Sequence, residues 1–417
     1  MKILLINPNR YRTPPVPPIA LEYLQSALRG TDHQTRILDL CFADDPAALL
    51  VKEIECFKPQ VAGVSVRNID TVIYWNNIFF LDEIKSLIDL LNKHSIPVIL
   101  GGSGFSFIPR GVLEYLGAGW GISGPAEIAL VHLLESFEKR PPPEGTILDG
   151  WHWGMNPELS IADRGEQIDY RAYLAEDGII GFETQKGCFE SCSYCPEGNG
   201  RVLFRNPRKV IEELNEIVSR GFDNFHLCDS EFNQDLSYCH KFLETLIAEG
   251  PSMHWVLYMK SSPYDEELFR LLSKSGARLI TLALPSGRDS LVHTVEIRRL
   301  CKKYGIRLAV DYFCGFPGET VESIRKAVET LRRIRPDVVG VNFAIRLYPG
   351  VEVTRTVMHS VKNRESLCGQ LEDNPLFVRP VFYKSISMDS LREIIGDDPL
   401  FKLEGFERTS NYERLKS

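Results

Sequence analysis

The sequence predicts an α/β protein with two successive β/α parts: a Rossmann-like domain, then a partial TIM-type barrel of six β/α units. From the first residue, short β-branched runs alternate with segments of helical period, as in a parallel sheet covered by helices. The run Lys139-Arg140-Pro141-Pro142-Pro143-Glu144-Gly145 interrupts the alternation, and we interpret it as a linker because proline cannot continue a helix. At 417 residues the chain can form two or more domains, each with its own core.

The front part, residues 1–140, is a common size for one domain. Its strands are expected at Lys2–Asn7, Thr35–Asp39, Val61–Val66, Pro97–Gly101 and Trp120–Ser123. Apolar spacing predicts its helices at Ile19–Leu28, Pro46–Cys56, Asn77–His94 and Ala126–Glu138. Residues 141–175 are expected to form a linker and connecting region, because Trp151–Leu174 shows no clear period.

The second alternation, over residues 176–350, predicts the barrel. Residues 351–417 are expected to form a C-terminal peripheral segment that ends, after Lys384, in a peripheral helix and tail. The barrel's strands are expected at Ile179–Thr184, Asn224–Cys228, Trp255–Met259, Leu279–Ala283, Leu308–Phe313 and Val338–Ala344. Its helices are expected at Pro207–Arg220, Leu236–Glu249, Asp265–Ser275, Ser290–Tyr304 and Val321–Arg333. Six such units indicate a partial barrel whose active site lies at the C-terminal strand ends.

Three cysteines, Cys188, Cys192 and Cys195, follow the first barrel strand in the pattern CxxxCxxC. This spacing can supply three thiolates to a 4Fe–4S cluster and leave the fourth iron open to a small molecule. A structural zinc site is the alternative, but zinc usually takes four ligands in paired spacings, and no second pair follows. With Tyr194 before the last cysteine, the loop resembles the signature of the radical S-adenosylmethionine enzymes. The resemblance implies that S-adenosylmethionine chelates the open iron.

Composition argues against a membrane protein and against a nucleic-acid-binding protein. No run approaches the roughly 20 apolar residues that span a bilayer, and the opening residues read as a strand, so a soluble, cytoplasmic protein without a membrane partner is expected. A thiolate-cluster pattern within ten cysteines indicates a reducing compartment. The net charge of −8 argues against a nucleic-acid partner, because phosphate binding needs concentrated Lys and Arg.

Three loops in the front part follow strands, where open parallel sheets bind ligands. They are Asn7-Pro8-Asn9-Arg10, Ser65-Val66-Arg67-Asn68-Ile69-Asp70 and Gly101-Gly102-Ser103-Gly104-Phe105-Ser106. A tight strand-to-helix turn would explain the glycines equally well. In order and pairing, the loops resemble those of the cobalamin-binding domain that precedes the radical S-adenosylmethionine core in one subgroup. The resemblance implies cobalamin contacts at Asn7, Ser65, Arg67, Asn68, Gly101, Gly102 and Gly104.

One departure concerns the lower face of cobalt. The Asp-x-His-x-x-Gly run that places an imidazole on cobalt in other corrinoid domains does not occur in this sequence. Arg67 is therefore our candidate for the residue beneath cobalt, where a cation cannot coordinate and would favour cob(I)alamin. The alternative is that Arg67 contacts a propionamide or an acidic neighbour such as Asp70.

The resemblance also locates the S-adenosylmethionine site. Asp229 and Glu231, after the second barrel strand, are candidates for the ammonium group because carboxylates suit that task, although the same turn could simply cap the next helix. The segment Cys314-Gly315-Phe316-Pro317-Gly318-Glu319-Thr320 resembles a family turn near the adenine, with Gly315 and Gly318 as contacts. At the fourth strand, Ala283-Leu284-Pro285-Ser286-Gly287 keeps Ser286 as a contact but has Pro285 where an acidic residue is usual. Formation of a deoxyadenosyl radical is thereby open to question.

The resemblance implies a cobalamin-dependent radical S-adenosylmethionine methyltransferase. A methyl group would pass from S-adenosylmethionine through methylcobalamin to carbon, or alternatively phosphorus, of a small metabolite or peptide, with flavodoxin or ferredoxin as electron donor. One alternative keeps both cofactors but catalyses a rearrangement or cyclisation. Another is a non-catalytic iron–sulfur binding or sensor protein. The sequence leaves the substrate and the methylated atom open.

Overall fold

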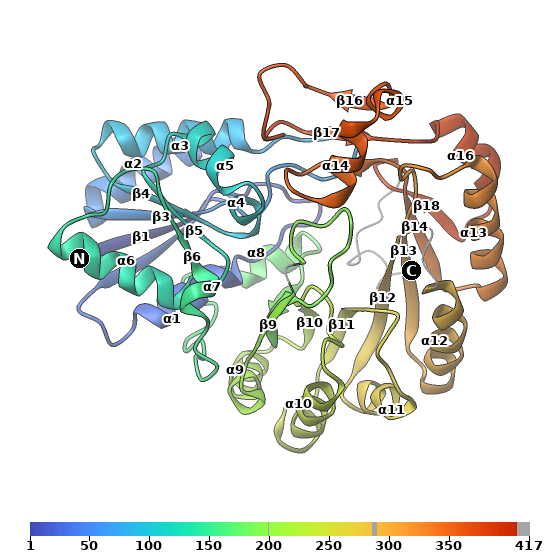
Figure 1. Cartoon of the computed structure of the whole chain (residues 1–417). Helices are drawn as coiled ribbons and strands as arrows, with labels where there is room; N and C mark the ends of the chain where they lie inside the picture. The colour runs from blue at the N-terminus through green and yellow to red at the C-terminus, as the bar shows by residue number, and fades with distance from the viewer. Residues whose placement is uncertain (199, 286–289, 407–417) are drawn as a thin grey trace. The chain divides into compact units, whose positions relative to one another are not determined.

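The computed structural model describes residues 1–198, 200–285 and 290–406. The chain forms two compact units. Unit 1 comprises residues 1–71, 78–181 and 203–217, and unit 2 comprises residues 72–77, 182–202 and 218–417. The expected α/β class is confirmed, with a parallel sheet in each unit (Figure 1).

Unit 1 is built on a six-stranded parallel sheet with the order β2-β1-β3-β4-β5-β6. Its strands are β1 (Lys2–Asn7), β2 (Gln34–Asp39), β3 (Val61–Ser65), β4 (Val98–Gly101), β5 (Trp120–Ser123) and β6 (Thr146–Asp149). Its helices are α1 (Ile19–Leu28), α2 (Pro46–Phe57), α3 (Leu81–Lys93), α4 (Ser103–Phe107), α5 (Pro109–Leu116), α6 (Glu127–Lys139), α7 (Gly150–Trp153) and α8 (Tyr170–Ala175). Helix α1 packs beside α6, whereas α2, α3 and α5 pack in succession, so helices cover both faces of the sheet (Figure 1). Strand order reverses between β1 and β3, the position where such sheets bind ligands.

The structure adds elements that the sequence did not predict in unit 1. Strand β6 directly follows the proline-rich linker and pairs in parallel with β5, Trp120 opposite Thr146. Helices α4 and α5 follow the Gly-Gly loop. A strand of four residues and a helix of five are too short to show a recognisable period.

Unit 2 contains the expected six barrel strands and a seventh, in the order β18-β14-β13-β12-β11-β10-β7. The strands are β7 (Ile180–Phe182), β10 (Asn224–Leu227), β11 (His254–Met259), β12 (Ala277–Pro285), β13 (Arg307–Phe313), β14 (Val338–Asn342) and β18 (Phe401–Leu403). The helices between them in the sequence are α9 (Pro207–Ser219), most of which belongs to unit 1, and α10 (Leu236–Glu249), α11 (Glu266–Lys274), α12 (Ser290–Tyr304) and α13 (Val321–Ile334). Helices α10 to α13 and α16 (Met388–Ile395) pack in succession along one side of the sheet (Figure 1).

After Lys384, where a peripheral helix and tail are expected, the structure has helix α16 and a further strand, β18. Strand β18 pairs in parallel with β14 and so extends the main sheet. Phe401 is buried, the Arg332 guanidinium lies 5.5 Å from its ring centre, and Arg332 also pairs with Asp398 at 3.1 Å. Those contacts fix a three-residue strand that has no pattern of its own in the sequence.

Two small sheets complete the fold. Strands β8 (Gln185–Cys188) and β9 (Arg201–Phe204) form one, and β15 (Ile345–Arg346), β17 (Val381–Tyr383) and β16 (Leu367–Gly369) form the other. The second packs on a buried apolar cluster with α14 (Glu352–His359), near which the short α15 (Val361–Arg364) lies.

Residues 203–217 belong to unit 1 through a buried polar network. Arg205 pairs with Glu213 at 2.6 Å and donates to the Tyr23 hydroxyl, whose ring centre lies 4.5 Å from the guanidinium. Glu213 also accepts from Tyr23 Oη at 3.1 Å and from the Ile161 amide at 2.9 Å. The ion pair is almost fully buried, so its hydrogen bonds must offset the cost of taking both charges out of water.

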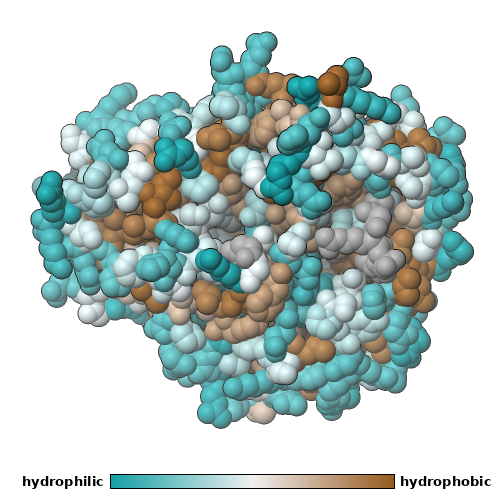
Figure 2. Space-filling model, viewed as in Figure 1, coloured by the Kyte–Doolittle hydropathy of each residue, from teal (hydrophilic) through white to brown (hydrophobic). Residues whose placement is uncertain are grey.

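No helix within the described residues is long and apolar enough to cross a membrane. The face shown in Figure 2 carries mostly polar side chains with apolar ones interspersed.

Candidate functional site

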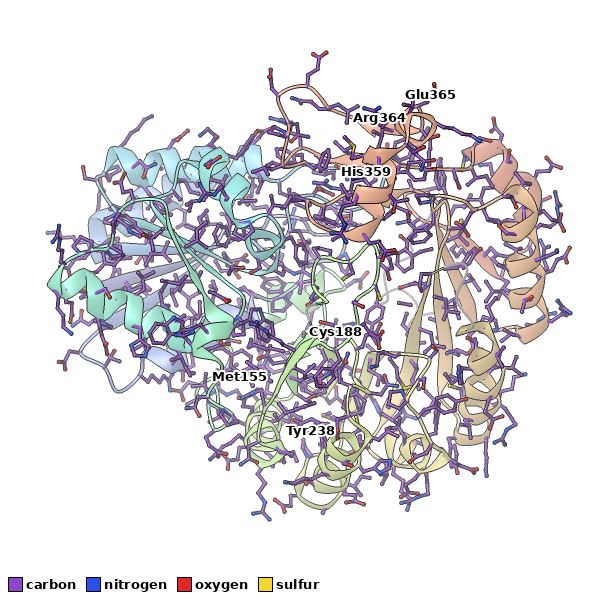
Figure 3. All side chains as sticks on the ribbon, viewed as in Figure 1. Met155, Cys188, Tyr238, His359, Arg364 and Glu365 are labelled. Carbon is purple, nitrogen blue, oxygen red and sulfur yellow. The ribbon has the colours of Figure 1, made fainter. Side chains whose placement is uncertain are left out.

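The three cysteines lie close together in the chain of unit 2. Cys188 ends β8, and Cys192 and Cys195 follow in the loop that leads to β9. Cys188, labelled in Figure 3, is buried, whereas Cys192 and Cys195 are half-buried. A single loop therefore presents all three sulfurs.

The turn before β8 is fixed by Asp229, which is buried at the end of β10. One carboxylate oxygen accepts from the amides of Thr184 at 2.8 Å and Gln185 at 3.2 Å, and the other accepts from the Thr184 hydroxyl at 2.5 Å. Tyr238, labelled in Figure 3, donates to the Thr184 carbonyl at 2.9 Å. Burial raises the pKa of Asp229 to about 7, although these hydrogen bonds oppose the rise. Both oxygens are thus engaged within the protein, which makes Asp229 an anchor of the cysteine-bearing strand.

Glu231, two residues further along, presents a different environment. Its Oε2 atom is buried and has no hydrogen-bond partner among the described residues. Burial raises the pKa of Glu231 to about 8, while the Lys260 ammonium lowers it. A buried carboxylate without a matching donor is costly, so an ammonium group on a ligand would satisfy it.

Hydrogen-bond donors converge on the sulfur of Cys188. The Glu190 amide lies 3.4 Å from Sγ, and the side-chain amide nitrogen of Gln234 lies 3.2 Å from it. Burial raises the pKa of the Cys188 thiol, whereas these two donors lower it. Burial likewise raises the pKa of Cys195 to about 11. The donors favour the thiolate, the form that binds iron.

The sulfurs are not arranged around a single ion. Across the positions that the structure describes, no three His, Cys, Asp or Glu side chains form a group that could hold one metal ion. In a cubane each thiolate binds a different iron, so the sulfurs stand apart. The thiolate donors and the N–H···S hydrogen bonds are those that an iron–sulfur cluster uses.

A cavity of about 320 Å³ adjoins the cysteine loop within unit 2. It is lined by Ser193, Tyr194, Pro285, Phe316, Pro317, Glu352, Val353 and Thr356. The Tyr194 ring stacks on Phe313, with ring centres 5.5 Å apart, and meets Phe316 edge-on at 5.7 Å. The Val353 amide of α14 donates to the Ser193 carbonyl at 2.9 Å, which ties the helix to the loop. The aromatic lining suits a flat heterocycle.

The glycine-containing turn after β13 lies beside this cavity, and a side chain of the turn itself holds its backbone in place. Glu319 Oε2 accepts from the amides of Gly315 at 2.6 Å and Phe316 at 2.7 Å. Gly315 has φ +92°, and a Cβ there would lie 2.2 Å from the Phe343 carbonyl oxygen. Gly318 has φ +87° and no atom within 4 Å of a Cβ position. Ser286, the remaining expected contact, lies outside the described residues.

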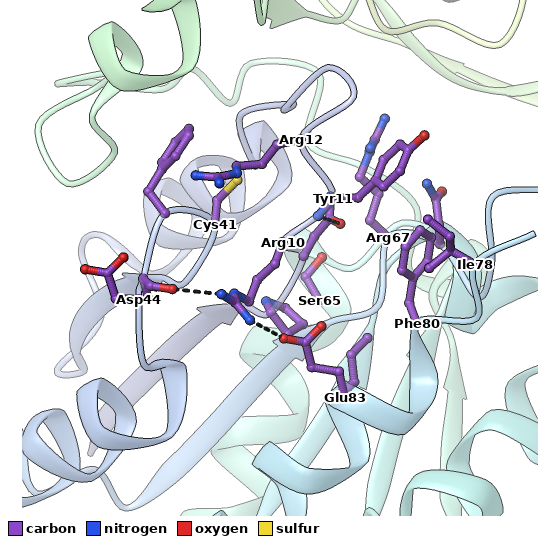
Figure 4. A pocket seen from close by; sticks show the side chains of 16 residues that line it. Arg10, Tyr11, Arg12, Cys41, Asp44, Ser65, Arg67, Ile78, Phe80 and Glu83 are labelled. Carbon is purple, nitrogen blue, oxygen red and sulfur yellow. Dashed lines mark hydrogen bonds and ion pairs between the residues drawn. The ribbon is translucent and has the colours of Figure 1, made fainter. Parts of the chain in front are cut away.

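Unit 1 contains a second cavity, of about 350 Å³, at the carboxyl ends of β1, β2 and β3 (Figure 4). Its lining residues are Pro8, Asn9, Arg10, Tyr11, Arg12, Cys41, Phe42, Ala43, Asp44, Ser65, Arg67, Asn68, Ile78, Phe80, Glu83 and Ile84. Arg10 joins two of the loops, pairing with Glu83 at 2.7 Å and donating to the Ala43 carbonyl at 2.9 Å. The cavity lies where strand order reverses, so its position matches the expected ligand site.

The expected cobalamin contacts fall into two groups. Ser65, Arg67 and Asn68 line the cavity. Asn7 does not line it; Asn7 is buried, and its side-chain amide donates to Asp39 at 2.8 Å.

The glycines do not line the cavity, and two of them pack on the loop after β3. A Cβ on Gly102, which has φ +97°, would lie 2.6 Å from the Val66 carbonyl oxygen, and one on Gly104 would lie 2.9 Å from Asn68. The Gly104 amide donates to the Arg67 carbonyl at 2.9 Å. Close contact between the two loops therefore accounts for Gly102 and Gly104, whereas a Cβ on Gly101 would have only the Ile122 carbonyl oxygen nearby, at 4.0 Å.

Sequence reasoning missed Gln234, Lys260 and Glu319 as parts of the site. Gln234 and Lys260 lie far from the cysteines in sequence, and no local pattern relates them to Cys188. The signal for Glu319 was present, because a carboxylate three residues after an aromatic in a glycine turn can accept backbone N–H groups.

Comparison with protein families assigns both parts of the chain. Residues 11–134 match the B12 binding domain, and residues 182–331 match the radical SAM superfamily. The chain is 26% identical to a tryptophan 2-C-methyltransferase of Streptomyces laurentii, over 89% of this chain and 77% of that protein. It is 21% identical to a cytidylyl-2-hydroxyethylphosphonate methyltransferase of Streptomyces wedmorensis, over 79% of this chain and 76% of that protein.

Solved structures support the fold. A radical S-adenosylmethionine methyltransferase from Kitasatospora setae, with cobalamin and a [4Fe-4S] cluster bound, is 23% identical and superposes with a TM-score of 0.84 over 97% of this chain and 93% of that one. The same enzyme with its tryptophan substrate and an S-adenosylmethionine analogue bound is 24% identical, with a TM-score of 0.88 over 98% and 92% of the two chains. With both matches in this order, the chain carries an N-terminal cobalamin-binding domain followed by a radical S-adenosylmethionine domain.

Proposed function

We propose that the protein is a cobalamin-dependent methyltransferase that transfers a methyl group from S-adenosylmethionine to carbon, or alternatively phosphorus, of a small molecule. The observation that carries this proposal is the similarity to a tryptophan 2-C-methyltransferase over 89% of the chain, which includes both cofactor domains. When bound, cobalamin supplies a methyl carrier, and the cluster supplies an electron and a binding site for S-adenosylmethionine.

In unit 2, Cys188, Cys192 and Cys195 would hold the cluster. The carboxylate of Glu231, which lacks a donor for Oε2, would accept hydrogen bonds from the S-adenosylmethionine ammonium. The cavity beside Tyr194 would take the adenine, with Pro285 closing one wall where relatives carry an acidic residue.

In unit 1, Ser65, Arg67 and Asn68 line the cavity at the strand ends and would contact cobalamin. A guanidinium keeps its charge at any physiological pH and has no lone pair to give to cobalt. Arg67 beneath the metal would therefore leave the lower face without a ligand and favour the low-coordinate state that accepts methyl. Gly101, Gly102 and Gly104 would shape this loop, and Asn7 would support it.

The proposal also includes the setting in which the protein works. A low-potential donor such as flavodoxin or ferredoxin would reduce the cluster. An oxygen-sensitive cluster would need the reducing cytoplasm. The acidic net charge of −8 makes a nucleic-acid substrate unsuitable.

The test is methyl transfer from methyl-labelled S-adenosylmethionine by protein reconstituted anaerobically with iron, sulfide and cobalamin. L-Tryptophan is the first probe and cytidylyl-2-hydroxyethylphosphonate the second, because similar proteins are named for them. Labelled product is expected from the wild type and not from the triple variant with alanine at Cys188, Cys192 and Cys195. Arg67→Ala is expected to keep the cluster absorption and lose methyl transfer, with Arg110→Ala, on an exposed helix surface, as its control.

Two outcomes would redirect the proposal. Consumption of S-adenosylmethionine without labelled product would favour a rearrangement or cyclisation. Reconstituted protein without cluster or corrinoid absorption would contradict the proposal altogether.

A further inference from the structure

Gln234 occupies a buried position between the cysteine strand and the loop that follows β11. It comes directly before the Asp235 N-cap of α10 and is 6% exposed. Its side-chain nitrogen lies 3.2 Å from Cys188 Sγ, and its oxygen lies 3.1 Å from the Phe189 amide and 3.4 Å from the Lys260 ammonium. One amide therefore joins the sulfur to a cation.

The orientation of this amide is determined by its partners. A backbone N–H and a lysine ammonium can only donate, so the group that faces them must be the carbonyl oxygen. Rotating the amide by a half turn would set donor against donor at two contacts and leave the sulfur beside an oxygen. The hydrogen-bonding partners of the oxygen therefore require that the NH₂ group face Cys188, as it does in the structure.

Lys260 is in turn held in place by its neighbours. Its ammonium pairs with Glu190 at 3.1 Å, and its side chain is only 12% exposed. Its backbone is clamped by the buried amide of Asn233, which accepts from the Lys260 N–H at 2.7 Å and donates to the Lys260 carbonyl at 3.1 Å. The loops after β10 and β11 are thus joined, and the charge cannot move far from Gln234.

Hydrogen bonds to cluster sulfurs, and nearby positive charge, stabilise the cluster more strongly when it carries the extra electron. We propose that Gln234, held by Lys260, donates a hydrogen bond to the Cys188 thiolate and raises the reduction potential of the cluster. Gln234 and Lys260 are positioning residues that act through the cysteine. This inference rests on the proposed function, because it requires that Cys188 bind a cluster.

The test is an EPR-monitored redox titration of the anaerobically reconstituted full chain, with iron and sulfide measured on every sample. Gln234→Leu keeps the approximate volume without a donor, Gln234→Glu places a carboxylate beside the sulfur, and Lys260→Met keeps the stem without the charge. Lys241→Met, on an exposed position of α10, is the control. At the wild-type midpoint, Gln234→Leu and Lys260→Met are expected to lower the ratio of reduced to oxidised cluster at least about threefold, or about 28 mV for one electron. Gln234→Glu is expected to lower it further.

The outcomes separate this inference from the function beneath it. Wild-type protein that binds no cluster would overturn both. Variants with full iron content and the wild-type potential would overturn the inference alone. Loss of iron from the Gln234 variants together with an unchanged potential in Lys260→Met would also overturn it, because Gln234 would then only hold the loop in place.

Discussion

The raised pKa of the buried Asp229 carboxyl predicts how the stability of the protein changes with pH. Burial raises its pKa from 3.8 to about 7, so between these values the folded protein binds a proton that the unfolded chain has released. The contribution of Asp229 to stability is therefore complete below pH 3.8 and is lost as the pH rises to about 7. Each factor of ten in proton affinity is worth about 1.4 kcal/mol, so the loss is about 4 kcal/mol.

Asparagine can replace Asp229 without this cost. Its Oδ1 can accept from the same two backbone amides, and its NH₂ can donate to the Thr184 hydroxyl once that hydroxyl rotates. Asp229→Asn is expected to be more stable than the wild type near pH 8 and to lose the advantage near pH 5. Asp229→Ala leaves three donors without an acceptor and is expected to cost at least about 3 kcal/mol relative to Asp229→Asn at both pH values.

Urea denaturation of anaerobically prepared protein near pH 5 and near pH 8 measures both effects. Other groups titrate over the same range, so the informative quantity is the wild-type free energy of unfolding minus that of Asp229→Asn at each pH. Asp235→Asn, at an exposed helix N-cap, is the control and should leave the dependence on Asp229 in place. An equal difference at both pH values, or an asparagine variant as unstable as the alanine variant, would refute the reasoning.

Two further sets of substitutions test the packing of unit 1. Gly102→Ala is expected to destabilise the protein by at least about 2 kcal/mol in thermal unfolding, because φ is +97° and the added carbon lies 2.6 Å from the Val66 carbonyl oxygen. Gly101→Ala, with its nearest atom at 4.0 Å, should be close to neutral, and equal effects would contradict the packing argument. Arg205→Met should cost about 3–5 kcal/mol because it leaves Glu213 buried and unpaired, and the double variant Arg205→Met with Glu213→Leu should recover part of that loss. A double variant that loses as much as the sum of the single changes would show that the pair is not coupled.

Much of the fold could be predicted because its longer elements have clear periods. The five predicted barrel helices and six predicted barrel strands are all present, with small differences at their ends. Strand β7 ends at Phe182 and not at Thr184, because the Thr184 amide and hydroxyl turn toward Asp229. Strands β6 and β18 were missed because they have four and three residues and are stabilised by pairing with distant partners.

In the site, too, features set by neighbouring residues could be predicted from the sequence, whereas contacts between distant residues could not. The cysteine spacing and the glycine turn are local patterns, so the sequence alone located them. Asp229 and Gln234 both follow β10, but what each does depends on partners from the turn before β8, from the cysteine segment that starts with β8 and from the loop after β11. The sequence could predict a polar turn at this position, yet it could not tell which of its side chains would be used internally and which would face a ligand.

The network of Arg205, Glu213 and Tyr23 has a consequence for any attempt to divide the chain. Because residues 203–217 belong to unit 1, a cut after residue 181 would separate Tyr23 and Ile161 from groups that they need. A fragment ending there would expose apolar surface and leave polar atoms unmatched, and so would tend to aggregate. A chimaera that joined the cobalamin-binding half of a relative to this barrel would meet the same obstacle. It would need the segment that corresponds to residues 203–217 to come from the same relative.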